Sequence, residues 1–334
     1  MSSPQELEKD LDRFQSRFLA LKAEIQKAIV GYDDLLTDTL VAVFARGHVL
    51  LEGVPGLGKT FLVQTLSEVL GLAPGRIQCT PDLMPADILG THIVNENEEG
   101  RRVMNFERGP VFANLVLVDE INRATPKTQA ALLEVMQEGA VTSGGETMQL
   151  PKPFFVMATQ NPMEMEGTYP LPEAQADRFL FKLRVPFPDR ATLMEISRRT
   201  AAFEPPGLEQ VMGADELLEF QKIVSKVPVA DHVEEYAARI VLATHPGDEG
   251  ATKDVDSYVS YGASPRGMQA LVRGARIHCA LDGRTAVSTE DIRRVALASL
   301  RHRVILNFQG EAESRDLDSI LETAVASVTE AVFV

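Results

Sequence analysis

The 334-residue chain is poor in cysteine and lacks long apolar runs, and both shortages limit what it can be. Its two cysteines, Cys79 and Cys279, are isolated from each other and from any Cys/His cluster. This argues against a disulfide framework or a zinc site and favours two small buried thiols. No apolar run approaches the length of a membrane span, and the N-terminal stretch MSSPQELEKDLDRF is charged where a signal peptide would be apolar. We therefore expect a cytoplasmic protein without membrane insertion.

Basic residues are also in short supply. The chain has 33 Lys and Arg against 48 Asp and Glu, which gives a net charge of -15 that is spread along its length. This balance argues against a surface whose main purpose is to bind nucleic acid, although a local basic groove remains compatible with it. The length and a hydrophobic content of 45% predict a globular protein of two domains or one large domain.

Helical and strand patterns alternate through the first half of the chain. An amphipathic pattern from Leu7 to Ile25 predicts an opening helix that packs on its own domain. Short buried strands are expected at 48–53, 115–120 and 154–159, and helices at 31–47 and 59–70. Apolar strands that alternate with helices predict an α/β fold around a parallel sheet flanked by helices.

Two stretches with turn residues at their centres, 92–107 and 140–153, predict hairpin insertions in this core. After 185–190 no convincing strand remains, and helical patterns continue to the end. We therefore expect an α/β domain at 1–187 and a smaller all-helical lid domain at 188–334. Within the second domain, Ser264 as N-cap and Pro265 at the first helical position predict the start of a helix.

The stretch GVPGLGKT lies between a predicted strand and a predicted helix. It matches G-x-x-x-x-G-K-[ST] at Gly53, Gly58, Lys59 and Thr60. In such a loop the backbone N–H groups surround phosphates, the lysine reaches the β and γ oxygens, and the threonine can bind Mg²⁺. A glycine turn without chemical function is the alternative, and the strand–loop–helix context argues against it.

The stretch LVLVDEINR ends an apolar run in two adjacent acids. Alone it would be an ordinary strand end, but downstream of a phosphate loop it predicts the second half of the site. We expect Asp119 to hold Mg²⁺ through its water shell, and Glu120 to orient and deprotonate the attacking water.

Three further polar residues are candidates for the same chemistry. Asn161 ends the next apolar strand, where its amide could hold the lytic water or sense the γ-phosphate; an Asn-Pro turn is the alternative. Arg178 follows Asp177 in LPEAQADRF, and Arg266 stands in the first turn of a helix. A cation there is unfavourable by up to about 1 kcal/mol, so Arg266 is expected to bind an anion, with a surface salt bridge as the alternative.

The segments GVPGLGKT, LVLVDEINR, ATQNP, YPLPEAQADRF and GASPRG occur in this order, and together they closely resemble the MoxR branch of the AAA+ ATPases. The resemblance extends from about Gly31 to the final helical region. It implies a P-loop α/β domain, a small helical lid and a homo-oligomeric ring, usually a hexamer. It also implies that Asp119 and Glu120 form the Walker B motif, Asn161 is sensor 1, Arg178 is an arginine finger that points into the neighbouring subunit, and Arg266 is sensor 2. The nucleotide-binding residues it implies are Val30, Gly31, Gly53, Val54, Pro55, Gly56, Leu57, Gly58, Lys59, Thr60 and Phe61.

The same resemblance implies a biological role. It predicts an ATPase with ATP and Mg²⁺ as cofactors and a chaperone-like action on protein clients, including a partner with a von Willebrand factor A domain. Segments 78–108 and 140–153 resemble inserts that relatives direct at the ring pore or a client. ATP is favoured over GTP because no N-K-x-D motif occurs. A nucleic-acid remodeller, which the acidic balance disfavours, and a slow nucleotide-controlled scaffold, which the intact Glu120 disfavours, are the alternatives.

Overall fold

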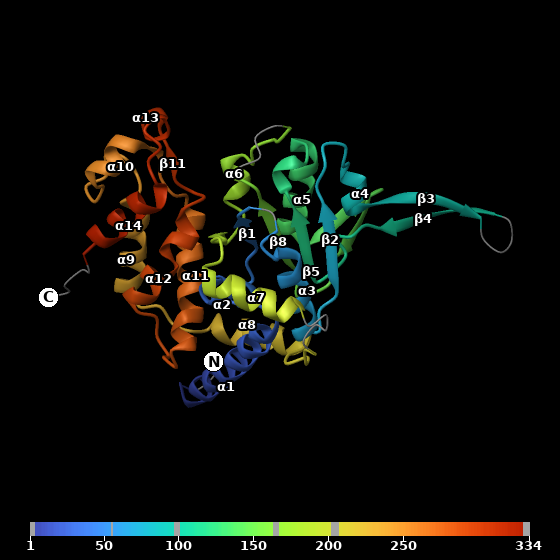
Figure 1. Ribbon diagram of the computed structural model, residues 1–334, viewed down its shortest axis with the longest axis horizontal. Coiled ribbons are helices and arrows are strands. Elements are labelled where there is room, and N and C mark those ends of the chain that lie inside the picture. Colours follow the sequence, from blue (N-terminus) through green and yellow to red (C-terminus); the bar gives the residue numbers. More distant parts are fainter. Residues whose placement is uncertain (1–3, 55, 97–100, 163–166, 202–206, 330–334) are drawn as a thin grey trace.

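Five parallel strands form the central sheet, and their spatial order differs from their order in the chain (Figure 1). They are β1 (Val49–Glu52), β2 (Pro74–Gln78), β5 (Leu115–Asp119), β8 (Phe155–Gln160) and β9 (Phe181–Arg184). The spatial order is β2-β5-β8-β1-β9, so β8 lies between β1 and β5. The computed structural model describes residues 4–54, 56–96, 101–162, 167–201 and 207–329.

The predicted strands at 48–53, 115–120 and 154–159 are confirmed as β1, β5 and β8. The two edge strands differ from them in composition, since β2 begins with Pro74 and Gly75 and β9 alternates apolar with charged residues. An edge strand is less buried than an inner strand, and it tolerates proline because one of its sides has no neighbouring strand to pair with. Their sequences therefore lack the apolar runs that mark the three inner strands.

Each face of the sheet has its own hydrophobic core, because successive strand residues point to opposite sides. Leu51 and Leu117 join a core with the first three helices, whereas Leu50 and Val118 join a second core with α5. The helices concerned are α1 (Pro4–Ala28), α2 (Asp33–Phe44), α3 (Lys59–Val69) and α5 (Pro126–Glu138). The sheet is thus flanked by helices, as the sequence predicts.

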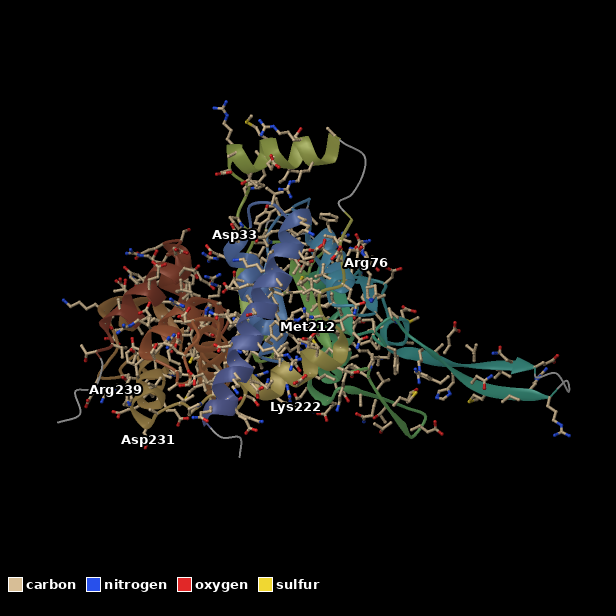
Figure 2. The ribbon with its side chains drawn as sticks, turned by 90° about the horizontal axis from the view of Figure 1, so that it is seen from below. Asp33, Arg76, Met212, Lys222, Asp231 and Arg239 are labelled. Carbon is tan, nitrogen blue, oxygen red and sulfur yellow. The ribbon has the colours of Figure 1, made fainter. Side chains whose placement is uncertain are left out.

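The opening helix α1 packs on more of the chain than expected. It contacts α3 of the sheet domain and also α8 (Ala214–Val224) and α11 (Pro265–Leu281) from beyond residue 188. Figure 2 shows α1 in blue between the C-terminal helices, in orange and red, and the rest of the chain. Phe14 of α1 lies at its centre, with ring centroids 5.0 Å from Phe44 and 5.5 Å from Phe220. Helix α1 thus packs on the sheet domain, as expected, and its apolar face also contacts helices from beyond residue 188.

The C-terminal part is mostly helical. Besides α8 and α11 it contains α7 (Arg190–Ala201), α9 (Asp231–Leu242), α10 (Lys253–Tyr258), α12 (Thr289–Leu300), α13 (Phe308–Ala312) and α14 (Leu317–Ser327). The expectation of an all-helical lid needs one correction: β10 (Val259–Tyr261) and β11 (Ile305–Leu306) form a short antiparallel pair. These strands are too short for a sequence pattern to reveal. The boundary between 187 and 188 stays a prediction, because a continuous core runs from α1 to the C-terminal helices.

Both predicted hairpins are confirmed. After the short helix α4 (Pro85–Leu89), β3 (Gly90–Glu96) and β4 (Arg102–Arg108) pair antiparallel and project far from the body (Figure 1). The second hairpin pairs β6 (Ala140–Ser143) with β7 (Glu146–Gln149). In the part of the chain that the structure describes, no helix is both long and apolar enough to cross a bilayer.

The packing of α1 gives a first prediction. Phe14→Ala should lower the free energy of unfolding by about 3–5 kcal/mol, because it removes a fully buried ring from the aromatic cluster. Leu19→Ala is the matched control, since Leu19 lies on the same helix with 57% of its surface exposed, and it should change stability by less than about 0.5 kcal/mol. Denaturant unfolding measures both. Equal effects would show that α1 is not anchored through Phe14.

Candidate active site

The loop between β1 and α3 has the backbone that the G-x-x-x-x-G-K-T motif requires. Gly56 and Gly58 have φ of +85° and +77°, and a Cβ at either position would meet nothing within 4 Å. The left-handed conformation, and not crowding, therefore requires glycine. Gly58 is the N-cap of α3, so the free N–H groups at the start of this helix are available to phosphate oxygens. Val54 lies in this loop, and Pro55 is outside the described residues.

Lys59 is the first residue of α3, and its side chain turns back along the loop. Its Nζ donates a hydrogen bond to the carbonyl oxygen of Gly53 at 2.8 Å. Partial burial lowers the pKa of the Lys59 amine, while the nearby charges of Asp119 and Glu120 oppose that shift. A bound triphosphate would add further negative charge and hold the amine in its cationic form.

Asp119 and Glu120 lie at the end of β5 and have different partners. Asp119 accepts a hydrogen bond from Thr159 Oγ1 at 3.0 Å and pairs with Arg76 at 3.1 Å. Glu120 pairs with Arg123 at 3.1 Å. The two neighbouring carboxylates are therefore held separately, which allows them to have separate roles.

The backbone of Glu120 is strained. Its φ and ψ are 55° and 53°, a left-handed conformation that costs a residue with a Cβ about 1–2 kcal/mol. Its N–H donates to Thr159 Oγ1 at 2.8 Å, and the same hydroxyl donates to Asp119. Thr159 thus fixes both acids from the neighbouring strand. Thr159 is a functional residue that the sequence motifs do not identify, and its place at the end of β8 is the only local signal for it.

A cavity of about 390 Å³ joins these groups. Asn161, at the end of β8, lies between the phosphate loop and the acids, as the strand order requires. The cavity lining contains Gly56, Gly58, Lys59, Thr60, Phe61, Gln64, Gln78, Asp119, Glu120 and Asn161. The hydroxyl and carboxylate oxygens here are the hard donors that Mg²⁺ prefers, so the residues fit this ion.

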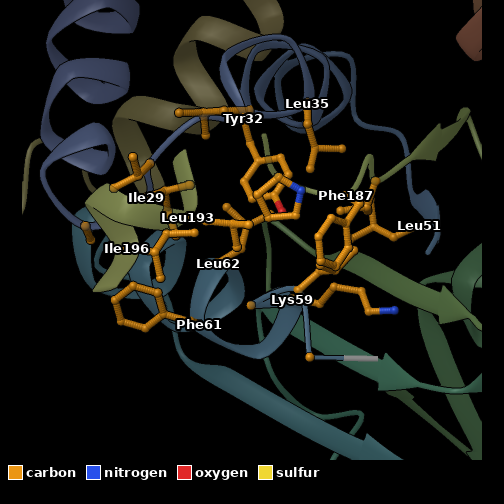
Figure 3. Close-up of a pocket in the computed structure, with 18 of the residues that line it drawn as sticks. Ile29, Tyr32, Leu35, Leu51, Lys59, Phe61, Leu62, Phe187, Leu193 and Ile196 are labelled. Carbon is orange, nitrogen blue, oxygen red and sulfur yellow. The ribbon is translucent and has the colours of Figure 1, made fainter. Parts of the chain in front are cut away.

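A second, largely apolar cavity of about 530 Å³ adjoins the first (Figure 3). Gly56, Gly58, Lys59 and Phe61 line both, so the two cavities meet at the phosphate loop. Val30 and Leu57, which the sequence analysis assigned to nucleotide binding, also line the apolar cavity. Its size, apolar walls and connection to the phosphate cavity suit a nucleobase with its ribose.

Helix α7 closes one side of the apolar cavity, and the sequence analysis missed it. Leu193 and Ile196 of α7 point into the cavity together with Phe187, which precedes the helix (Figure 3). Arg199 ties α7 to α1 by donating hydrogen bonds to the carbonyl oxygens of Gln26 at 3.1 Å and Lys27 at 2.6 Å. These contacts join segments more than 170 residues apart, so no local sequence pattern predicts them.

Gly31 does not line the apolar cavity, and its expected part in nucleotide binding stays a prediction. It lines an adjoining cavity, and Tyr32 lines both. A Cβ on Gly31 would lie 2.4 Å from a side-chain carbon of Thr192. Glycine is needed here because α7 approaches closely, and the next residue, Tyr32, lines the apolar cavity.

Arg178 and Arg266 do not reach the phosphate loop within the chain. They line a separate cavity of about 190 Å³ that shares no described lining residue with the other two. Arg178 precedes β9, whereas the phosphate loop follows β1, and these neighbouring strands are parallel. Arg178 and the phosphate loop therefore lie at opposite ends of the parallel strands. Each of the two strands has four residues, which separates their backbones by at least about 13 Å. The structure brings the two arginines together and separates both from Lys59 and Glu120.

One carboxylate holds both arginine-bearing segments. Asp177, next to Arg178, accepts hydrogen bonds from Arg303 Nε at 2.8 Å and from Ser264 Oγ at 2.8 Å. Ser264 in turn caps α11, accepting from the N–H of Arg266 at 3.1 Å, so the predicted N-cap is confirmed. Burial lowers the pKa of Arg303 to about 10, and the charge of Asp177 opposes this, so Arg303 is a cation at neutral pH.

Comparisons with known proteins agree with this geometry. A family profile described as "ATPase family associated with various cellular activities (AAA)" matches residues 48–181, and an AAA lid domain profile matches 251–324. The protein Chaperone MoxR1 of Mycobacterium tuberculosis is 44% identical over 91% of this chain and 80% of its own length. YeaC of Bacillus subtilis is 42% identical, over 91% and 92%, and Protein MoxR of Methylorubrum extorquens is 35% identical, over 85% and 86%. The crystal structure of a Cytophaga hutchinsonii protein described as an ATPase superposes with a TM-score of 0.90 at 39% identity, over 97% of this chain and 98% of that one.

The sheet, phosphate loop, paired acids and lid therefore define a nucleotide-binding ATPase of the AAA+ class. Within that class, the chain belongs to the MoxR-type AAA+ ATPases, a family of chaperone-like enzymes.

Thr159 gives a prediction specific to this site. Thr159→Val keeps the shape of the side chain but removes both hydrogen bonds, leaving the Glu120 N–H without its partner, at a cost of about 1–3 kcal/mol. ATP hydrolysis should fall by about tenfold or more, with nucleotide affinity largely kept. Thr159→Ser, which keeps the hydroxyl, should hydrolyse ATP nearly normally. A valine variant with unchanged turnover would show that the tie between the acids is dispensable.

Proposed function

We propose that this protein binds Mg²⁺–ATP in its two adjoining cavities and hydrolyses it in a ring of identical subunits, to remodel partner proteins. One observation carries the proposal: Lys59 and Glu120 line the phosphate cavity, whereas Arg178 and Arg266 line a cavity at the opposite edge of the sheet. Within one subunit these groups do not meet. In a head-to-tail ring the arginine edge of one subunit faces the phosphate cavity of the next.

The chemistry of each group follows from its position. Lys59 and the N–H groups of the phosphate loop bind the β- and γ-phosphates. Glu120 takes a proton from a water whose oxygen attacks the γ-phosphorus, and the bond to the β,γ-bridging oxygen breaks to release ADP and phosphate. Asn161 orients that water. Thr60 and Asp119 would hold Mg²⁺, which neutralises charge on the phosphates.

The apolar cavity supports ATP as the nucleotide. Its walls come mainly from aliphatic and aromatic side chains such as Leu35, Leu193 and Phe187. Guanine has more polar groups that need partners than adenine, and burying them against apolar walls is costly. The absence of an N-K-x-D motif points the same way.

The biological role is proposed from the family. A relative that is 44% identical is named a chaperone, and the family resemblance implies a ring of six subunits and protein clients, including one with a von Willebrand factor A domain. The net charge of -15 disfavours nucleic acid as the client. Glu120→Gln protein with ATP should retain one defined protein partner that Lys59→Ala protein does not. Retention of nucleic acid instead would contradict the proposal.

Two substitutions separate binding from hydrolysis. Glu120→Gln should keep ATP affinity and lose about 10²- to 10⁴-fold in turnover, because an amide cannot accept the proton. Lys59→Ala should weaken binding itself, because it removes the cation at the phosphates. Equilibrium titration with a fluorescent ATP analogue and a phosphate-release assay measure the two quantities. Normal turnover in Glu120→Gln would remove this residue from the mechanism.

Mixing inactive variants tests whether Arg178 acts on a neighbour. Arg178→Ala should bind ATP nearly normally and hydrolyse it about 10³- to 10⁵-fold more slowly. Mixed with Glu120→Gln protein, it forms interfaces where an intact Glu120 faces an intact Arg178, so part of the activity should return.

The matched control is a mixture of Glu120→Gln with Lys59→Ala. Both defects are in the same site, so every interface in this mixture lacks one of the two groups and no activity should return. Native mass spectrometry verifies co-assembly in both mixtures. Co-assembled rings of Arg178→Ala and Glu120→Gln without recovered hydrolysis would refute the action of Arg178 in trans.

A further inference from the structure

Arg46 has a backbone conformation that favours glycine. It follows α2 and has a φ of +54°. Its N–H bonds to the carbonyl oxygen of Val43 at 3.2 Å, and that of Gly47 bonds to Ala42 at 2.8 Å, which is the Schellman arrangement at a helix end. Glycine is the usual residue at the left-handed position of this motif, because a Cβ there is strained. An arginine at this position therefore gives a less stable fold than a glycine would.

Arg46 is exposed to solvent and borders a cavity that is lined mainly by cations. It lines the 190 Å³ cavity together with Arg178, Arg266, Arg273 and Arg303. Asp177 is the one carboxylate in that described lining, and Arg303 and Ser264 already bind it. No ion pair involving Arg46 is present among the residues that the structure describes.

A hydrogen bond to the preceding residue holds Arg273 near Arg46. Arg273 Nε donates to the carbonyl oxygen of Ala45, the residue before Arg46, at 3.0 Å. The charge of Arg46 adds to burial in lowering the pKa of Arg273. A left-handed backbone alone does not mark a functional residue, but at Arg46 it coincides with the guanidinium groups that line the same cavity, and this combination indicates a functional constraint.

We propose that Arg46 is a third cation, beside Arg178 and Arg266, that binds the phosphates of the nucleotide held by the adjacent subunit. This inference rests on the proposed ring. Arg46 precedes β1 as Arg178 precedes β9, so both lie at the edge of the sheet opposite the phosphate loop. A triphosphate presents several oxygens to several guanidinium groups, and it supplies the negative charge that this cavity lacks.

The test is a substitution that should raise stability and lower activity together. Arg46→Gly relieves the left-handed strain and the charge repulsion, so the Tm should rise by about 2 °C or more. Steady-state ATP hydrolysis by the assembled protein should fall by about tenfold. The affinity of the dilute, unassembled subunit for ATP should stay unchanged, because Arg46 does not line its own nucleotide cavities. Arg46→Lys keeps the charge and should retain an intermediate rate.

Ser314→Gly is the matched control. Ser314 is exposed, has a φ of +52° and follows α13 in the same Schellman arrangement, with its N–H on Glu311 at 3.0 Å and that of Arg315 on Gly310 at 2.9 Å. It does not line the arginine cavity. The glycine variant should therefore gain similar stability with unchanged hydrolysis.

The outcomes separate this inference from the proposed function. Full activity of Arg46→Gly alongside an inactive Arg178→Ala would overturn the role of Arg46 and leave ring hydrolysis intact. Full activity of both would overturn the two together. If native mass spectrometry shows weakened assembly but normal turnover per assembled ring, Arg46 binds protein carboxylates of the neighbour, and the phosphate assignment is overturned.

Discussion

The position of β8 between β1 and β5 is the constraint on which the site depends. Because the strands are parallel, the loops after all three emerge at one edge of the sheet, and the polar end of β8 lies between the phosphate loop and the two acids. Thr159 can then bind Asp119 and Glu120 together, and Asn161 can face both halves of the site. Because of the same parallel arrangement, the residues that precede the strands lie at the opposite ends of the strands. Arg178 is separated from Lys59 because Arg178 precedes its strand, whereas Lys59 follows the neighbouring parallel strand.

Residues that lower the stability of the fold lie at both ends of the parallel strands. At one edge Glu120 has a left-handed backbone, held by a hydrogen bond to Thr159. At the other, Arg46 has a similar conformation, and the buried guanidinium of Arg303 is stabilised by Asp177 and by the carbonyl oxygens of Phe179 and Leu180. A protein selected for stability alone would not need these features. Their location at the two edges that a ring would bring together gives them a common explanation.

Much of the fold and the centre of the site could be predicted from the sequence, because the signals are local. Buried strands such as Leu115–Asp119 have continuous apolar runs, and the phosphate loop needs glycines at fixed spacing. Features that depend on distant segments could not be predicted in this way. Helix α7 lines the apolar cavity and is tied to the end of α1 by Arg199, and Gly31 is required by the close approach of Thr192.

Arg266 illustrates a different limit. Its place in the first turn of α11 predicted an anion partner but not where Arg266 lies in the fold. Ser264 binds Asp177, and this contact fixes α11 beside Arg178. Residues that precede a parallel strand lie at the opposite edge from those that follow one, so the placement of Arg178 was already implicit in the order of the chain. The placement of Arg266 required the packed lid.

The most direct test of the account is a high-resolution structure of the assembled protein with ADP and aluminium fluoride, a mimic of the transferring phosphoryl group. The account predicts that Lys59 and Glu120 of one subunit, and Arg178 and Arg266 of the adjacent subunit, surround the same aluminium fluoride group. A structure in which both arginines contact the nucleotide of their own subunit, or in which no second subunit approaches the phosphate cavity, would contradict it.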